Sequence, residues 1–148
     1  MLHKSFFKTM IGYLTNLGYL SDNPFEGNPD YPDYWILLQS EPTFDNWASL
    51  EATYGGYARQ HYYRNPTIWM LNDGPPFFAG NRNLITFPAP TSDAGQVLSH
   101  WGWLYPVAGS GGASYGLVVA GPLSNPITTE IGQTIIFPVN SITVKAPY

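Results

Sequence analysis

The sequence predicts an all-β fold, an antiparallel β-sandwich or barrel, preceded by a single N-terminal amphipathic helix. Three observations lead to this prediction. The chain of 148 residues contains 15 glycines and 14 prolines, which favour many turns and few long helices. Short runs of aromatic and β-branched residues recur along most of the chain, as is typical of strands. No helical pattern separates these runs, whereas a parallel sheet would need crossover helices between its strands.

The predicted helix lies at the start of the chain, where residues 1–20 would form an arm. Apolar residues recur there at steps of three and four, which places them on one stripe of a helix. Gly18 is suitably placed to end the helix. Residues 21–33 contain three prolines, so we expect an extended linker there, followed by a β-domain over residues 34–148. The apolar stripe comprises Phe7, Met10, Ile11, Leu14 and Leu17.

The β-domain is expected to contain eight short strands. In one of them Trp101 and Trp103 share a face and His100 lies on the other, because successive side chains of a strand alternate. His100 is therefore expected to be an ordinary half-buried, hydrogen-bonded strand histidine. The stretch 72–81 is rich in proline and glycine and has the composition of an inserted turn or loop. The eight predicted strands cover residues 34–38, 57–63, 67–71, 83–87, 97–104, 115–120, 134–137 and 141–145.

Charged residues are few and unevenly distributed. They make up 11% of the chain, against about 25% in ordinary globular proteins. Between residues 83 and 148 only Asp93, Glu130 and Lys145 are charged. A free monomer keeps a charged surface, so this half is expected to be covered by partners. A secreted β-protein with a surface of serine, threonine and asparagine is the alternative.

The charge and hydropathy patterns argue against nucleic-acid and membrane partners. The net charge is −4, and the lysines and arginines are scattered singly, so no cluster neutralises phosphates. No run of about 18 apolar residues is present, so no membrane span is expected. Polar residues interrupt the apolar character of the N-terminal segment, which argues against a secretory signal. The absence of cysteine excludes disulfides and thiolate–metal sites.

No residue pattern points to catalysis, to a metal or to a cofactor, and we expect none of them. The three histidines lack the spacing of a zinc site. Neighbouring acids such as Glu41 and Asp45 lack the further oxygen ligands of a calcium loop. The aromatic residues remain as candidates, among them 5 tryptophans and 11 tyrosines. They would either fill the core and a subunit interface or form a platform on which sugars stack.

Short motifs follow one another in a particular order along nearly the whole chain. They are Tyr-x-x-Leu-x-x-x-x-Pro at residues 34–42, Gly55-Gly56-Tyr57-Ala58-Arg59, Ile85-Thr86-Phe87-Pro88, Trp101-Gly102, Gly121-Pro122-Leu123, Gly132 and Ile142-Thr143-Val144. This order resembles that of small virion proteins of tailed phages, which are known as capsid cement (decoration) or tail-fibre-like proteins. Two stretches depart from the pattern. Gln39-Ser40 stands where similar proteins carry His-Thr, and 72–81 is unusually long.

The resemblance implies a jelly-roll-like β-sandwich that is a non-enzymatic part of a virion. A cement protein would bind the major capsid protein of the assembled shell and self-associate as a dimer or trimer. The helix stripe and the linker would reach a neighbour, or else dock back on their own domain. Tyr57 and Arg59 are further interface candidates, with Arg59 either making a bidentate contact or facing solvent on an edge strand. The alternative is a tail or tail-fibre component that contacts a receptor or a glycan.

Overall fold

The computed structural model describes residues 33–62, 69–72, 78–106 and 115–145. The predicted arm and almost all of the predicted linker lie outside these residues. The chain divides into two compact units, which we describe separately: residues 31–62 and 86–136 form one, and residues 1–30, 63–85 and 137–148 form the other. The elements are β1 (Asp33–Leu38), α2 (Trp47–Leu50), β2 (Gln60–Tyr62), β3 (Trp69–Asn72), β4 (Phe78–Asn81), β5 (Ile85–Phe87), β6 (Val97–Pro106), β7 (Tyr115–Thr128), β8 (Ile135–Phe137) and β9 (Thr143–Lys145).

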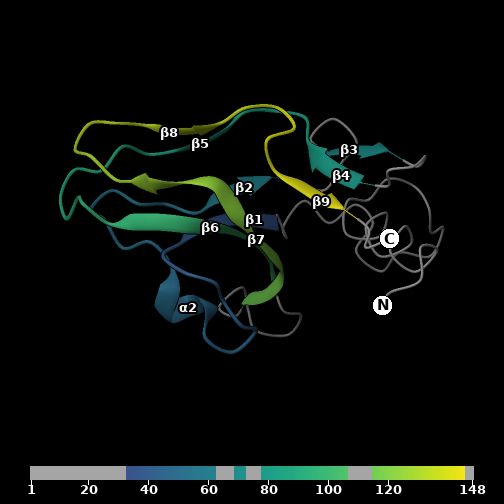
Figure 1. Ribbon diagram of the computed structural model, residues 1–148, viewed down its shortest axis with the longest axis horizontal. Helices are drawn as coiled ribbons and strands as arrows, with labels where there is room; N and C mark the ends of the chain where they lie inside the picture. The colour runs from purple at the N-terminus through teal and green to yellow at the C-terminus, as the bar shows by residue number, and fades with distance from the viewer. Residues whose placement is uncertain (1–32, 63–68, 73–77, 107–114, 146–148) are drawn as a thin grey trace. The chain divides into compact units, whose positions relative to one another are not determined.

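A four-stranded sheet forms the centre of the first unit, with the strand order β2-β1-β6-β7 (Figure 1). Its three strand pairs are all antiparallel, which confirms the predicted all-β, antiparallel class. β1 and β6 are central, and their register pairs Trp35 with Trp103 and Leu37 with Trp101. β2 pairs with β1 only over Asp33–Trp35. On the same side, the second half of β1 is bonded to the segment 50–52: the Gln39 N–H donates to the Leu50 carbonyl and the Ala52 N–H to the Leu37 carbonyl, both at 2.9 Å.

One face of this sheet is built from indoles, and we call it the tryptophan face. Trp35, Trp101 and Trp103 lie on it and are all buried, as the predicted alternation of Trp101 and Trp103 requires. Trp35 stacks on Trp103 with ring centroids 5.7 Å apart and contacts Trp101 at 5.4 Å. Gly121 of β7 lies against the Trp101 indole, where an added Cβ would be 3.0 Å from the ring. A glycine is needed there because the ring packs directly on the backbone.

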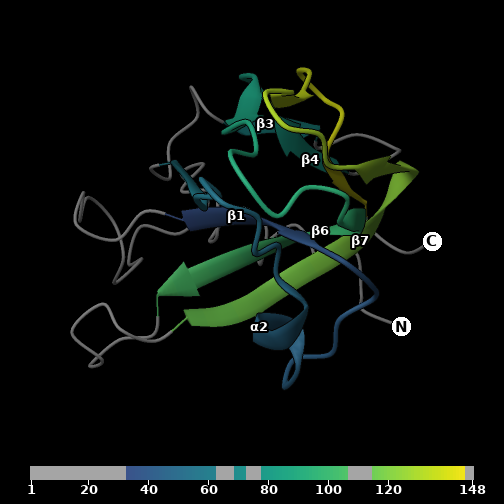
Figure 2. The same cartoon turned by 90° about the vertical axis from the view of Figure 1, so that its left-hand side faces the viewer.

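The opposite face, the α2 face, is aliphatic and is covered by the short helix α2 (Figure 2). Trp47 of α2 packs on a cluster that contains Ile36, Leu38, Leu104 and Leu117. The expectation that no helix interrupts the strands is therefore wrong. With four residues and one buried side chain, α2 is too short to show a helical repeat in the sequence.

β7 is longer than predicted. The run 115–120 was expected to end before Gly121-Pro122, but the strand continues to Thr128 through Pro122 and Pro126. Proline is tolerated in an edge strand, because the N–H that it lacks is not needed by a further neighbour. The ladder between β6 and β7 shifts register between Leu98 and His100, and again between Trp103 and Leu104.

The described part of the second unit contains a three-stranded sheet with the order β3-β4-β9, again antiparallel. β4 occupies part of the stretch 72–81, so the expectation of a turn or loop over this whole stretch is wrong. Asn81 at the end of β4 is buried and fully used: its amide donates to the carbonyls of Pro138 (2.8 Å) and Asn83 (2.7 Å) and its oxygen accepts from the Ile142 N–H (3.1 Å). These bonds hold the end of β4 to the segment 138–142 that leads into β9.

Two short strands, β5 and β8, pair with each other, and the division between the units passes through them. Both show the alternation that the sequence predicts for half-buried strands. Ile85 and Phe87 are buried on either side of the exposed Thr86, and Ile135 and Phe137 on either side of the exposed Ile136. Among the described residues, no helix is long and apolar enough to cross a membrane.

Candidate functional site

The Gly-Gly-Tyr-Ala-Arg motif places Tyr57 beside the second half of β1 and Arg59 beside Glu51, which forms a bridge with the end of β1. The chain turns at Tyr54–Tyr57, closed by a hydrogen bond from the Tyr57 N–H to the Tyr54 carbonyl (3.0 Å). Gly56 is the third residue of this turn and has a φ of 84°, which glycine adopts at little cost. The motif is therefore a turn that sends the chain into β2.

Tyr57 completes the edge of β1. Its hydroxyl oxygen accepts a hydrogen bond from the Leu37 N–H at 3.1 Å, between the part of β1 that pairs with β2 and the part that is bonded to the segment 50–52. Its ring stacks on Phe87, with centroids 6.1 Å apart and planes within 4° of parallel. Burial, and after it the negative charge of Glu51, raise the pKa of Tyr57 well above its usual range. Tyr57 thus stays neutral and serves the sheet as a hydrogen-bond acceptor.

Arg59 forms a bidentate ion pair with Glu51. Its Nε donates to Oε1 at 2.8 Å and its terminal nitrogen to Oε2 at 2.7 Å. The guanidinium also lies 5.3 Å from the centroid of the Trp47 ring and 4.9 Å from that of Tyr115, within the range of cation–π attraction. The hydrogen bonds to Glu51 raise the pKa of Arg59, against the opposing effect of burial. Arg59 therefore makes a bidentate contact, but with a partner in the same chain, and its role at an interface stays a prediction.

Arg59 and the three residues that it contacts, Glu51, Trp47 and Tyr115, hold separate segments of the fold together. The Arg59 side chain is 28% exposed and that of Glu51 10%, so both charges are largely shielded from water. Through its contacts Arg59 ties the start of β7 to α2 and to the segment that leads into β2. The sequence motif identified Tyr57 and Arg59, but gave no sign that Glu51 would be their partner. Phe7, Met10, Ile11, Leu14 and Leu17, the other interface candidates, lie outside the described residues.

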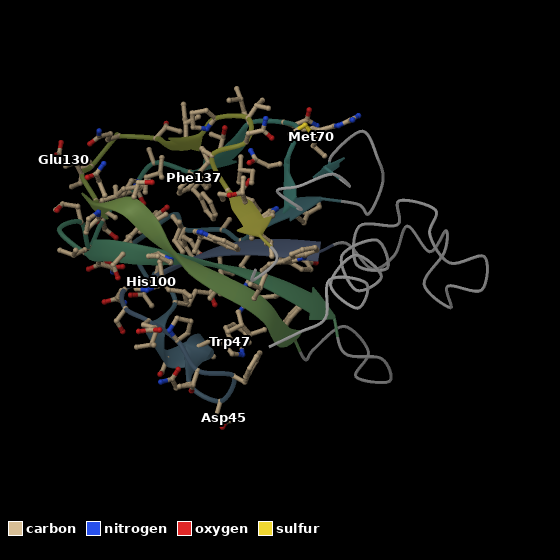
Figure 3. The ribbon with its side chains drawn as sticks, turned by 45° about the vertical axis from the view of Figure 1, so that its right-hand side comes forward. Asp45, Trp47, Met70, His100, Glu130 and Phe137 are labelled. Atoms are coloured by element: carbon tan, nitrogen blue, oxygen red, sulfur yellow. The ribbon has the colours of Figure 1, made fainter. Side chains whose placement is uncertain are left out.

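A second feature, which we call the Phe44 groove, lies at the α2 face of the sheet. It is a hollow of about 320 Å³ between the loop 41–44 and strands β6 and β7. Glu41 and Phe44 of the loop, His100 of β6, and Val119 and Ala120 of β7 line it. Phe44 is 73% exposed, which is unusual for so large an apolar side chain. Figure 3 shows His100 on the same side of the sheet as Trp47.

A short chain of hydrogen bonds indicates the tautomer of the neutral His100 ring. The Ser99 hydroxyl donates its single proton to the Gln39 carbonyl at 2.9 Å. Ser99 Oγ is also 2.9 Å from His100 Nδ1, so Nδ1 must be the donor in that contact. In the neutral ring Nε2 then carries the lone pair. The expectation of a half-buried, hydrogen-bonded histidine is confirmed.

The same hydrogen bonds bear on catalysis. In a serine–histidine dyad the hydroxyl donates to the imidazole, which acts as base. Ser99 instead donates to a backbone carbonyl, so in this arrangement its proton is not directed at His100. Among the residues that the structure describes, no group of three or more histidine, aspartate or glutamate side chains is placed to hold a metal ion.

Comparison with known proteins assigns no family. No protein-family model matches the chain, and no curated protein matches it. The functional argument therefore rests on the composition, on the motif order and on the two features just described. The sequence did not indicate the groove, because its walls come from segments more than fifty residues apart. The one local signal was an apolar aromatic residue, Phe44, in a polar loop that begins with proline.

Proposed function

We propose that this chain is a structural virion protein of a tailed phage, a capsid cement protein that binds the assembled shell and stabilises it. The observation that carries the proposal is the apolar surface of the charge-poor half of the chain. Ile131 is 70% exposed and Ile136 is 53% exposed, and both lie in the half that has three charged residues. Large aliphatic side chains on so weakly charged a surface are typical of faces that another subunit covers.

The mechanism in this proposal is thermodynamic. A protein that binds the assembled lattice more tightly than the free capsid protein shifts the equilibrium toward the assembled particle by mass action. No chemical step is needed, and the donors of Arg59 and the hydroxyl proton of Ser99 are used within the chain. The major capsid protein is the proposed partner, and a dimer or trimer is the proposed form of the cement protein itself.

The finer features of the expected fold belong to this proposal. They are a jelly-roll-like arrangement of the sheets and an N-terminal helical arm whose stripe reaches a neighbouring subunit. Tyr57 and Arg59 would contribute indirectly, because they hold the edge of β1 and the start of β7 in place. The exposed aliphatic residues near β8 would supply direct contact.

The proposal is tested by co-sedimentation of the full chain with shells that lack it. We expect the chain to sediment with assembled shells and not with free capsid protein, in a ratio to the capsid protein near one or a simple fraction of it. Replacing the exposed aliphatic residue in Ile136→Lys should abolish sedimentation, since a charge would then have to be buried at the contact. The matched control Ser124→Lys adds the same charge at an exposed position of β7.

Two results would contradict the cement function. One is a chain that fails to sediment with shells. The other is a copy number of a few per cent of the capsid protein in purified particles, which would favour the alternative of a tail or tail-fibre component. The Phe44 groove is the feature that supports this alternative, because a hollow with both polar and apolar lining can hold part of a receptor or a glycan.

A further inference from the structure

We propose that the Phe44 groove binds a neutral sugar ring. This inference goes beyond the cement function and does not depend on it, because a shell protein and a tail protein can both present a sugar site to the outside. The argument rests on the polar groups of the groove, on its apolar walls and on its size.

The polar groups of the groove are hydrogen-bond acceptors. Glu41 is exposed and, within the described part of the chain, its carboxylate makes no hydrogen bond or ion pair. The Nδ1 atom of His100 is held by Ser99, which leaves Nε2 as a second acceptor without a partner in the same part of the chain. A ligand that satisfies both groups must offer several hydrogen-bond donors. Sugar hydroxyls do so without carrying charge.

The apolar walls require a ligand that also has a carbon-rich face. Phe44 presents its exposed ring at the loop, and Leu117, Val119 and Ala120 line the side formed by β7. A pyranose has such a face of C–H groups, with hydroxyls around its rim. It can therefore cover an aromatic or aliphatic wall while its hydroxyls reach Glu41 and His100.

The size and charge of the groove separate a sugar from other ligands. Small-molecule sites measure about 300–1,000 Å³, so a hollow of about 320 Å³ suits one or two rings. Among the described residues that line it there is no lysine or arginine, so these residues offer phosphate and other anions no counter-charge. A lysine side chain of a protein partner would pair with Glu41, but its compact, strongly hydrated ammonium gains little from the apolar walls.

The test uses the isotope-labelled full chain and amide chemical shifts in NMR spectra. The probes are the methyl pyranosides of glucose, galactose, mannose, N-acetylglucosamine and N-acetylgalactosamine, with N-acetyl-lysine methylamide as the basic alternative. We expect at least one pyranoside to shift the amides of loop 41–44 and of the neighbouring part of β7. Phe44→Ala and Glu41→Gln should each weaken binding about tenfold, the effect of losing about 1.4 kcal/mol.

Both variants change exposed side chains, so the fold should persist, and an unchanged amide spectrum outside the groove checks this. The control Ile131→Ala removes an equally exposed apolar side chain that does not line the groove and should leave binding unchanged. The proposal is overturned if no pyranoside shifts these amides up to tens of millimolar. It is also overturned if the lysine probe binds in place of the sugars, or if Ile131→Ala abolishes binding while Phe44→Ala does not. Neither the expected result nor these outcomes bear on sedimentation with shells.

Discussion

The two faces of the four-stranded sheet differ in the interactions that their side chains make. The tryptophan face is a stack of buried indoles, with Trp35 in contact with both Trp101 and Trp103. The α2 face has an aliphatic core, but above it lie an ion pair between Arg59 and Glu51 and an open groove. One side of the sheet is therefore suited to stability alone. The other combines packing with an ion pair and with a groove that has polar side chains in its lining.

The largest expected effect is on the tryptophan face. Trp103→Ala removes a fully buried indole that stacks on Trp35, and we expect a loss of about 3–5 kcal/mol in the free energy of unfolding. Urea denaturation followed by circular dichroism measures this loss at low and at high salt. With sodium chloride as the salt, the loss should be nearly the same at both, because the contacts of an uncharged indole contain no ion pair that salt could screen. A loss below about 1 kcal/mol would show that this face is not the main support of the sheet.

An intermediate effect is expected from the ion pair on the α2 face. Glu51→Gln should cost about 2–3 kcal/mol, because it leaves the half-buried guanidinium of Arg59 without its counter-charge. Arg59→Lys should not preserve the wild-type stability, since an ammonium cannot form the two parallel bonds or lie flat against Trp47 and Tyr115.

A double-mutant cycle with Glu51→Gln and Arg59→Gln isolates the coupling between these two side chains. In contrast to Trp103→Ala, this coupling should weaken when salt is added. Additive losses in the double variant would mean that the pair contributes nothing beyond the packing of each side chain.

The smallest loss of stability is expected from the hydrogen bond between Tyr57 and the backbone of β1. Tyr57→Phe removes the acceptor of the Leu37 N–H and should cost about 1 kcal/mol at neutral pH. The pKa of Tyr57 is raised in the folded chain, so above the ordinary tyrosine pKa of about 10 the unfolded chain loses a proton that the folded chain retains. The contribution of Tyr57 to the stability of the wild type should therefore be constant below that pH and should fall above it.

The Tyr57→Phe variant should lose stability less steeply in alkali than the wild type. A residual decline is expected from Tyr54, whose pKa burial also raises. Unfolding by urea at several pH values between neutral and alkaline measures both slopes. Parallel slopes for the two proteins would rule out Tyr57 as a source of the alkaline sensitivity.

The sequence predicted most strands of the described residues, because their aromatic and β-branched runs alternate between buried and exposed positions. It missed α2, which is a single turn anchored by Trp47, and β4, whose sequence Phe-Ala-Gly-Asn has weak strand propensity. It also placed the end of β7 too early. Proline is tolerated in an edge strand, but the sequence does not show that β7 lies at the edge of its sheet, because the order of the strands depends on the tertiary fold.

The sequence predicted features of the two sites only where the residues concerned are neighbours along the chain. The two glycines before Tyr57 and Arg59 showed that these residues leave a turn, whereas their contacts with Glu51, Leu37 and Tyr115 depend on the tertiary fold. The Phe44 groove joins a loop to a strand far along the chain. No pattern within either segment specifies that neighbourhood.

The edge position of β7 has a consequence for the proposed cement function, in which the chain would gather in many copies. An uncovered strand edge offers donors and acceptors to any other extended chain and so promotes aggregation. β7 carries two prolines without N–H groups, and its ladder with β6 is irregular at two places. Proline and bulges are two means by which natural sheets discourage such pairing. At the high local concentration that the proposed cement function implies, these irregularities would keep neighbouring copies from fusing into one continuous sheet.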